Sequence, residues 1–189
     1  MVPRPRSQVL TVALIAANPE NPVQPPSLPD QAEHVVTLAR DRHMSLATVE
    51  SCTAGALVHL LAQAEGASET LHGGFVVYTK ENKIAATGVP IDLLAKHTAV
   101  SAEVALAMAM GGLGRCPASL VASITGVAGP EPDEDGNPVG LVYIAVAARD
   151  GRQRVEKHEL GEQPKSEICQ AAMQAALRLL EEMLSAHVP

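Results

Sequence analysis

Residues 46–64 read LATVESCTAGALVHLLAQA, and this stretch indicates the fold of the chain. Residues 46–49 are typical of a short strand, and residues 56–64 are typical of an apolar helix. The small residues 51–55 lie between them. A strand that runs directly into a helix is a building block of layered α/β domains, so we expect helices packed on a sheet.

The same alternation continues on both sides of this stretch. Asp30 is a candidate N-cap for a helix over 30–42, Pro90 starts a short helix, and Ser101 caps a helix over 102–110. Late in the chain Asp150-Gly151 predicts a hairpin. The pattern predicts a three-layer α/β/α sandwich with a mixed, mainly parallel sheet. Further strands are expected at 75–78, 120–124, 141–148 and 154–160, and further helices at 81–86 and 165–186.

The first thirty residues differ in composition from the rest. Five prolines fall between residues 19 and 29, which favours an extended arm over a helix. We therefore expect residues 1–30 to be a Pro-rich extension and residues 31–189 to be one domain. Arg4 and Arg6 before an apolar run over 9–17 imitate a secretory signal, but an extra strand or a misplaced start codon are alternatives.

Charge and cysteine usage exclude several classes of protein. The 189 residues carry 14 basic and 21 acidic side chains, a net charge of −7, which disfavours direct nucleic-acid binding. No apolar run reaches the length of a membrane helix, so we expect no membrane partner. Cys52, Cys116 and Cys169 form no CxxC pair and favour a reducing compartment, the cytoplasm. The seven histidines show no metal-binding grouping, and we expect no metal and no cofactor.

Ser51 stands where a strand meets a helix. A serine there can point its hydroxyl into a cleft while the backbone N–H groups that follow, at the positive end of the helix, face a developing oxyanion. The plainer interpretation is that Ser51 or Thr53 only caps the helix. Cys52 is a rival nucleophile, although a buried small hydrophobic residue is its commoner role.

Two lysines and a tyrosine follow the second predicted strand. A lysine with a lowered pKa can serve as the base of a serine nucleophile. Lys80 and Lys83 lie three residues apart, so their charges should lower one another's pKa. The alternatives are that both lysines are solvated at the surface, and that Tyr78 packs its ring in the core.

Residues 125–129, TGVAG, follow a third predicted strand. Two glycines and the hydroxyl of Thr125 resemble an anion-binding turn, although no P-loop lysine follows and a plain loop is the alternative. Because ligands of open α/β sheets bind beyond the carboxyl ends of strands, this turn could meet Ser51 and Lys83 in one site.

Taken together, these segments resemble the nicotinamide-nucleotide amidohydrolases, also found as the C-terminal domain of CinA-type competence-damage proteins. The matches occur in the family's order and cover about residues 31–185. They are 49–55 (VESCTAG), 73–83 (GGFVVYTKENK), 88–90 (GVP), 100–109 (VSAEVALAMA), 124–130 (ITGVAGP) and 138–143 (PVGLVY).

The resemblance implies hydrolysis of the carboxamide of nicotinamide mononucleotide, or of a related pyridine nucleotide amide, to the acid and ammonia. It implies a Ser51 nucleophile assisted by Tyr78 and Lys83, with Lys80 standing where the family usually has asparagine. The expected substrate-binding residues are Cys52, Thr53, Gly55, Gly74, Thr125 and Gly126.

Two departures from the family pattern bear on the substrate. Residues 161–166 read GEQPKS where the family commonly has Gly-Asp-Arg and a further arginine, so only Lys165 could meet a carboxylate or phosphate there. The loop after Pro130 contains Glu131, Asp133, Glu134 and Asp135. This negative charge should discourage a phosphate unless the loop points away from the site.

Two other functions remain open from the sequence. A non-catalytic nucleotide-binding or regulatory module of the same fold fits the missing arginines. A DNA-associated accessory role is suggested only by the competence-damage association, and the net charge argues against it. We also expect a homodimer or a higher homo-oligomer, with the alanine-rich helix over 102–110 as one candidate interface.

Overall fold

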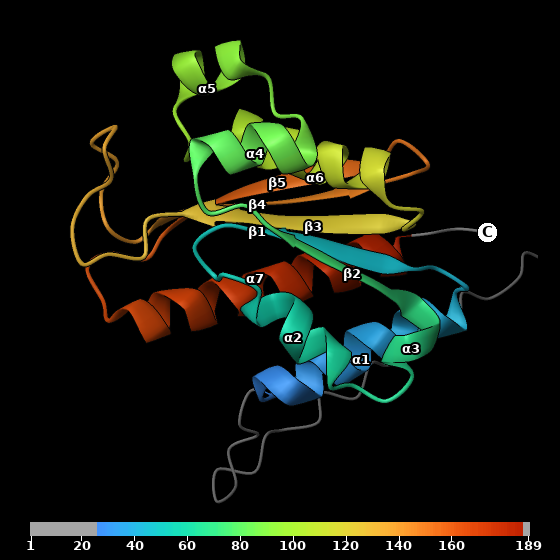
Figure 1. Ribbon diagram of the computed structural model, residues 1–189. Coiled ribbons are helices and arrows are strands. Elements are labelled where there is room, and N and C mark those ends of the chain that lie inside the picture. Colours follow the sequence, from blue (N-terminus) through green and yellow to red (C-terminus); the bar gives the residue numbers. More distant parts are fainter. Residues whose placement is uncertain (1–25, 187–189) are drawn as a thin grey trace, which may run out of the picture.

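The computed structural model describes residues 26–186 (Figure 1). Its centre is a five-stranded sheet in the order β2-β1-β3-β4-β5. β1 pairs in parallel with β2 and β3, whereas β4 is antiparallel to both β3 and β5, so β4 runs against the other four described strands. This confirms the mixed, mainly parallel sheet. The strands are β1 (Leu46–Glu50), β2 (Leu71–Val76), β3 (Leu120–Gly126), β4 (Leu141–Ala148) and β5 (Gln153–Glu159).

Helices cover both faces of the sheet, which confirms the α/β/α layers (Figure 1). One face carries α1 (Leu28–Asp41), α2 (Ala56–Ala62), α3 (Ala67–Thr70) and α7 (Lys165–Ser185). The other face carries α4 (Lys80–Thr87), α5 (Ile91–His97) and α6 (Ala102–Arg115).

Each interface between helices and sheet has its own apolar core. Leu46 and Ile124 point to the face of α1 and α7, while Val49 and Val121 point to the face of α6. Because successive strand residues alternate between faces, β1 and β3 are buried on both sides. The ends of these central strands are therefore held rigidly, and the site is built there.

The first helix begins earlier than predicted, and Asp30 is not its N-cap. Ser27 caps α1: its hydroxyl accepts from the Asp30 N–H at 3.3 Å, and the Asp30 carboxylate accepts from the Ser27 N–H at 3.1 Å. Such a capping box satisfies two N-terminal donors at once, and proline is tolerated in the first turn. Residues 1–25, with the signal-like stretch and most of the predicted extension, lie outside the described residues, and the domain boundary stays a prediction.

Helix α6 continues past its predicted end at residue 110 as far as Arg115. The added turn contains glycines, which let α6 pack closely against α4 and the sheet. A Cβ on Gly111 would lie 2.0 Å from the Thr87 carbonyl oxygen, and one on Gly112 would lie 2.8 Å from a methyl of Val121. The second strand also differs: β2 begins at Leu71, four residues before the prediction, and ends at Val76. No helix among the described residues has the length and apolar character needed to span a membrane.

Candidate active site

A pocket of about 400 Å³ opens beyond the carboxyl ends of β1 and β3. Its lining includes Ser51 after β1, Tyr78 and Lys83 after β2, and Thr125 at the end of β3. Val77 extends the β1–β2 pairing by donating its N–H to the Glu50 carbonyl at 2.8 Å, which brings Tyr78 beside the Ser51 loop. The three segments that the sequence singled out therefore meet in one place.

Lys83 and Ser51 are in direct contact inside this pocket. The Lys83 Nζ lies 2.9 Å from the Ser51 Oγ and donates to the Val77 carbonyl at 3.2 Å. The side chain extends from the first turn of α4, a helix that Thr79 caps through the N–H of Asn82. Lys83 is only 2% exposed and Ser51 only 6%, so the surface-lysine alternative is wrong for Lys83.

The two lysines have opposite surroundings. Burial, with a smaller contribution from the nearby charge of Lys80, lowers the pKa of Lys83 to about 8. Hydrogen bonds from Lys80 to Asp135 and Glu134 raise the pKa of Lys80 to about 12. The expected mutual lowering therefore holds for Lys83 and is wrong for Lys80. Near neutral pH only Lys83 can supply a neutral amine, which is the form a base requires.

The carboxylate of Glu50 organises the turn that carries Ser51, a role the sequence analysis did not assign. Glu50 is fully buried and accepts hydrogen bonds from the N–H groups of Leu57 and Val58, at 3.0 and 2.8 Å. These are the second and third N–H groups of α2, and neither the Ser51 nor the Thr53 side chain caps that helix. The helix-cap interpretation of Ser51 is therefore wrong. So is the expectation that the amino end of α2 faces the pocket.

Three of the residues expected to bind substrate lie behind the pocket wall rather than in it. The Thr53 hydroxyl donates to Glu50 at 2.8 Å, and the Gly55 N–H donates to the same carboxylate at 3.0 Å. Gly55 has a φ of +95°, which lets the chain turn sharply into α2. A Cβ on Gly74 would lie 2.4 Å from the Thr48 hydroxyl oxygen, so this glycine permits close packing of β2 on β1.

Cys52 lines the pocket but is unsuited to be a nucleophile. Burial raises the pKa of its thiol to about 12, so the reactive thiolate is absent at neutral pH. It is 5% exposed and contributes to the apolar core under α1 and α7. This matches its interpretation as a small buried hydrophobic residue.

Thr125 and Gly126 also line the pocket. The Thr125 hydroxyl is held by donating to the Ala99 carbonyl at 2.8 Å, which ties the end of β3 to the segment before α6. Ala99 and Val100 form part of the lining as well, a position that was not predicted from the sequence. A signal was present, since Val100 begins one of the stretches shared with the family.

Tyr78 occupies an exposed position at the pocket. It is 58% exposed, and the Lys165 ammonium lies 6.0 Å from the centre of its ring. Its ring is therefore outside the core, contrary to the core alternative. Lys165 is the first residue of α7, so this helix brings a cation beside the exposed Tyr78 ring.

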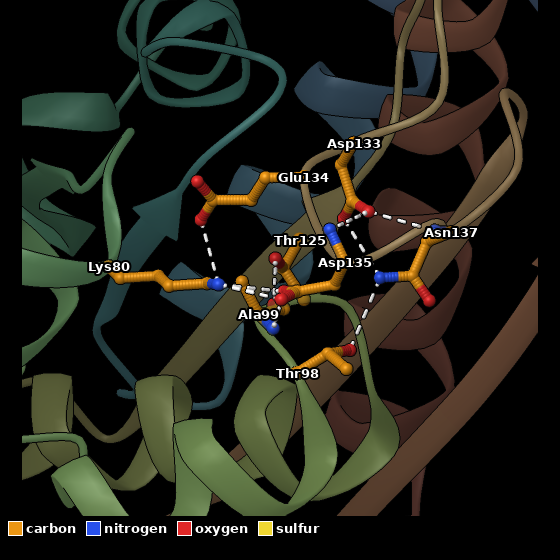
Figure 2. A network of polar contacts seen from close by, with 8 residues as sticks. All are labelled: Lys80, Thr98, Ala99, Thr125, Asp133, Glu134, Asp135 and Asn137. Atoms are coloured by element: carbon orange, nitrogen blue, oxygen red, sulfur yellow. Dashed lines mark hydrogen bonds and ion pairs between the residues drawn. The ribbon is translucent and has the colours of Figure 1, made fainter.

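The acidic loop between β3 and β4 does not point away from the site. Glu131, Asp133, Glu134 and Asp135 all line the pocket. Lys80 ties the loop down through contacts of 2.7 Å to Glu134 and 2.8 Å to Asp135 (Figure 2). Its negative charge therefore belongs to the ligand-binding surface. Within residues 26–186, no group of three or more histidine, cysteine or carboxylate side chains is arranged to hold a metal ion.

Comparison with known proteins assigns the family. The family model of the CinA C-terminal domain matches residues 29–184. The chain belongs to the CinA C-terminal domain family. A CinA-like protein of Chloroherpeton thalassium is 38% identical over 156 residues, which is 82% of this chain and 37% of that protein. The chain thus spans little more than a third of this curated relative.

Solved structures of the CinA superfamily share the whole described fold. The crystal structure of the competence/damage inducible protein CihA from Agrobacterium tumefaciens superposes with a TM-score of 0.81 at 33% identity, covering 84% of this chain and 96% of that one. A CinA superfamily protein from Escherichia coli gives a TM-score of 0.80 at 29% identity, covering 85% and 94%. Both the recognition of the family and the predicted fold class are therefore confirmed.

Proposed function

We propose that the protein is a serine amidohydrolase that hydrolyses the carboxamide of nicotinamide mononucleotide or of a related pyridine nucleotide amide. The observation that carries this proposal is the 2.9 Å contact between the buried Lys83 amine and the Ser51 hydroxyl. A serine becomes a useful nucleophile when an adjacent base accepts its proton, and a desolvated lysine is such a base.

The reaction starts from the neutral amine of Lys83, which accepts the Ser51 proton as the serine oxygen attacks the amide carbon. The resulting tetrahedral oxyanion collapses, the C–N bond breaks, and ammonia leaves with the proton that Lys83 returns, directly or through the Tyr78 hydroxyl, so that Lys83 is neutral again. Water, deprotonated by the neutral Lys83, then attacks the acyl-serine ester. This step releases the carboxylic acid, and Lys83 returns a proton to the Ser51 oxygen.

Backbone N–H groups beside Ser51 suit the oxyanion. Because Glu50 takes the N–H groups of Gly55, Leu57 and Val58, the proposed donors are those of Cys52, which lines the pocket, and of Thr53, the next residue along the turn, whose hydroxyl is held by Glu50 behind the pocket wall. Among residues 26–186, neither of these two N–H groups donates to another residue. A pair of free donors next to a nucleophile is the arrangement that stabilises acyl-transfer transition states.

The proposal also covers the cellular compartment, the absence of a cofactor and the oligomeric state. We place the enzyme in the cytoplasm because its three cysteines are free, as in proteins of reducing compartments. The proposed chemistry uses side chains, backbone N–H groups and water, and it assigns no step to a cofactor. A homodimer or higher homo-oligomer remains our prediction for the assembly.

The direct test is ammonia release from nicotinamide mononucleotide by the purified protein. Ser51→Ala should reduce the rate by at least about a thousandfold, because the covalent route is lost. Ser68→Ala changes an exposed serine of α3 and should leave the rate unaltered. Failure to release ammonia from any pyridine carboxamide would contradict the proposal.

A non-catalytic nucleotide-binding module is the second candidate, and the acidic lining and missing arginines favour it. Calorimetry distinguishes the two. This alternative predicts heat of nucleotide binding that Ser51→Ala does not change, together with no turnover.

A further inference from the structure

The proposed nucleophile offers little of its surface to solvent. Ser51 and Lys83 are almost completely buried, and Thr125 on the wall beside them has no exposed surface, although all three line the pocket. A carboxamide has to bring its carbonyl carbon within bonding reach of the Ser51 oxygen before it can react. Access to Ser51 therefore depends on which walls of the pocket can move.

The turn over 125–129 belongs to the rigid part of the wall. Val127 and Ala128 are buried in this turn. Val127 donates its N–H to the Leu141 carbonyl at 2.9 Å, and its own carbonyl accepts the Gly140 N–H at 2.8 Å. These contacts fasten the turn to the beginning of β4, so it keeps its place when a ligand enters.

Residues 131–137 of the acidic loop are held differently, because none of their side chains is buried. Hydrogen bonds within the loop make it a compact unit. Asp133 accepts from the N–H groups of Asp135 and Asn137, at 3.0 and 2.8 Å, and from the Asn137 amide at 2.8 Å. A unit that has internal bonds but no buried apolar anchor can move as a whole at little cost.

Lys80 fastens this loop to the opposite wall. Its ammonium contacts Glu134 at 2.7 Å and both carboxylate oxygens of Asp135, at 2.8 and 2.9 Å (Figure 2). Because Lys80 extends from the first turn of α4, these ion pairs join two walls of one pocket. All three side chains are partly exposed, so the attraction between them is modest and weakens in salt.

A second contact joins the loop to a strained segment. Asn137 donates to the Thr98 hydroxyl at 3.2 Å, and the Ala99 N–H donates to Asp135 at 3.4 Å (Figure 2). Thr98 has a φ of +63°, a conformation that β-branched residues rarely adopt. Strain of this kind is typical of segments that clamp ligands or switch between two arrangements.

We propose that residues 131–137 are a lid over the Ser51 pocket and that Lys80 latches this lid in its closed position. The inference rests on the proposed amidohydrolase function and concerns how a substrate reaches the nucleophile. Opening breaks the ion pairs of Lys80 and moves the carboxylates of the lid aside. Ser51, Lys83 and the turn over 125–129 stay in place.

The lid also reconciles an acidic wall with a nucleotide substrate. When the lid opens, the Lys80 ammonium is released from its two carboxylates and becomes available to a phosphate. Lys165 lies beside the exposed Tyr78 ring and forms no ion pair with any residue between 26 and 186. The open pocket therefore presents cations to an anionic substrate, whereas the closed pocket presents carboxylates.

The test measures how fast a neutral alkyl fluorophosphonate labels Ser51. In this reaction the serine oxygen bonds to phosphorus, fluoride leaves, and Lys83 takes the proton. Lys80→Met should raise the second-order labelling rate about three- to tenfold, the scale of one or two partly exposed ion pairs. Added salt should speed labelling of the wild type but not of the variant, because the probe itself is uncharged.

The pH of the measurement separates access from proton transfer. Lys80→Met also removes a charge that helps to lower the pKa of Lys83. At about pH 10, Lys83 is neutral in both proteins, while Lys80, with its pKa of about 12, keeps its charge in the wild type. Lys80→Arg should restore the wild-type rate because it keeps the ion pairs. Lys96→Met changes an exposed lysine of α5 and should label like the wild type.

A second readout is independent of the chemistry at Ser51. A glutamate-specific endopeptidase should cut after Glu134 about threefold faster or more in Lys80→Met than in the wild type, because the released lid fits the protease cleft. The cut after Glu65, an exposed residue between α2 and α3, should be equally fast in both proteins.

The outcomes separate the lid from the function on which it rests. Labelling of Lys80→Met that is no faster than that of the wild type would overturn the lid and leave the amidohydrolase standing. Absence of label on Ser51 in every protein would contradict the proposed nucleophile, and proteolysis would then decide about the lid alone. Equal cleavage after Glu134 in wild type and Lys80→Met would overturn it.

Discussion

The amine of Lys83 lies 2.9 Å from the hydroxyl of Ser51, although the two residues are 32 positions apart in the chain. Ser51 ends its strand by donating its N–H to the Ile124 carbonyl at 2.9 Å, so it is fixed to the centre of the sheet. Lys83 reaches it from α4, where Thr87 is buried one turn later on the same side. Burial of the Lys83 amine away from solvent favours its neutral form.

The pH dependence of hydrolysis should follow the protonation of Lys83. Because burial lowers its pKa to about 8, kcat/KM should rise tenfold per pH unit below that value and level off above it. At pH 6 the rate should be about a hundredfold below the plateau. A rate that stays flat from pH 6 to 8 would show that Lys83 does not act as the base.

Lys83→Met should abolish activity and also stabilise the protein at neutral pH. The folded-state pKa is about 8 against an ordinary value of 10.5, so below pH 8 the native state bears the full cost of burying the charge. That cost is about 3 kcal/mol, and the two lost hydrogen bonds offset about 1 kcal/mol of it. We expect a gain of about 2 kcal/mol at pH 7.

The sign of this effect can be checked by denaturant unfolding at several pH values. Between pH 8 and 10.5 the unfolded wild-type chain binds more protons, so wild-type stability rises with pH. The advantage of Lys83→Met should therefore shrink over that interval. A variant less stable than the wild type at pH 7 would contradict a buried, destabilising amine.

Glu50→Gln should destabilise the fold strongly although it alters few atoms. One carboxylate oxygen accepts from Thr53, Gly55 and Leu57, and the other accepts from Thr48 and Val58. An amide NH₂ in place of either oxygen would face two or three donors. We expect a loss of about 2–4 kcal/mol in the free energy of unfolding, with lower activity because the Ser51 turn loosens.

The matched control for Glu50 is Glu33→Gln, which makes the same chemical change at an exposed position of α1. Its effect should stay within about 0.5 kcal/mol. Thermal unfolding of the two variants beside the wild type separates them. Equal melting temperatures for all three proteins would show that Glu50 does not hold the turn.

Tyr78→Phe should cost far less activity than Lys83→Met. Lys83 contacts Ser51 directly, so proton transfer between them needs no relay, and the Tyr78 side chain lies largely exposed at the pocket. We expect kcat to fall by less than about tenfold. A loss as large as that of Lys83→Met would show that the Tyr78 hydroxyl itself carries a proton.

The sequence predicted the place of the site because of one general property of α/β sheets. Loops after parallel strands gather at the carboxyl edge, so Ser51, Lys83 and Thr125 could be expected to meet. The alternation of strands and helices predicted the layers, because each helix that follows a strand packs back onto a face of the sheet. Helix ends were less accurate: Ser27 stands in a proline-rich stretch that hides its capping role, and the glycines of α6 look like a helix end until their close neighbours are known.

What the sequence could not show depends on contacts between distant residues. Glu50 at the end of a strand looks like a solvated carboxylate, and only the turn folded over it explains its burial. Lys80 and Lys83 are chemically alike, and the acidic loop some fifty residues further on separates their roles. The direction of that loop, which gives the pocket its charge, also follows from tertiary contacts rather than from local sequence.

Acylation of Ser51 can be observed by mass spectrometry of the protein quenched in acid during turnover of a pyridine carboxamide. We expect a pyridinecarbonyl group attached to the peptide that contains Ser51 in the wild type, and no such group in either Ser51→Ala or Lys83→Met. Steady ammonia release by Ser51→Ala, or an acyl group found on Cys52 instead, would contradict it.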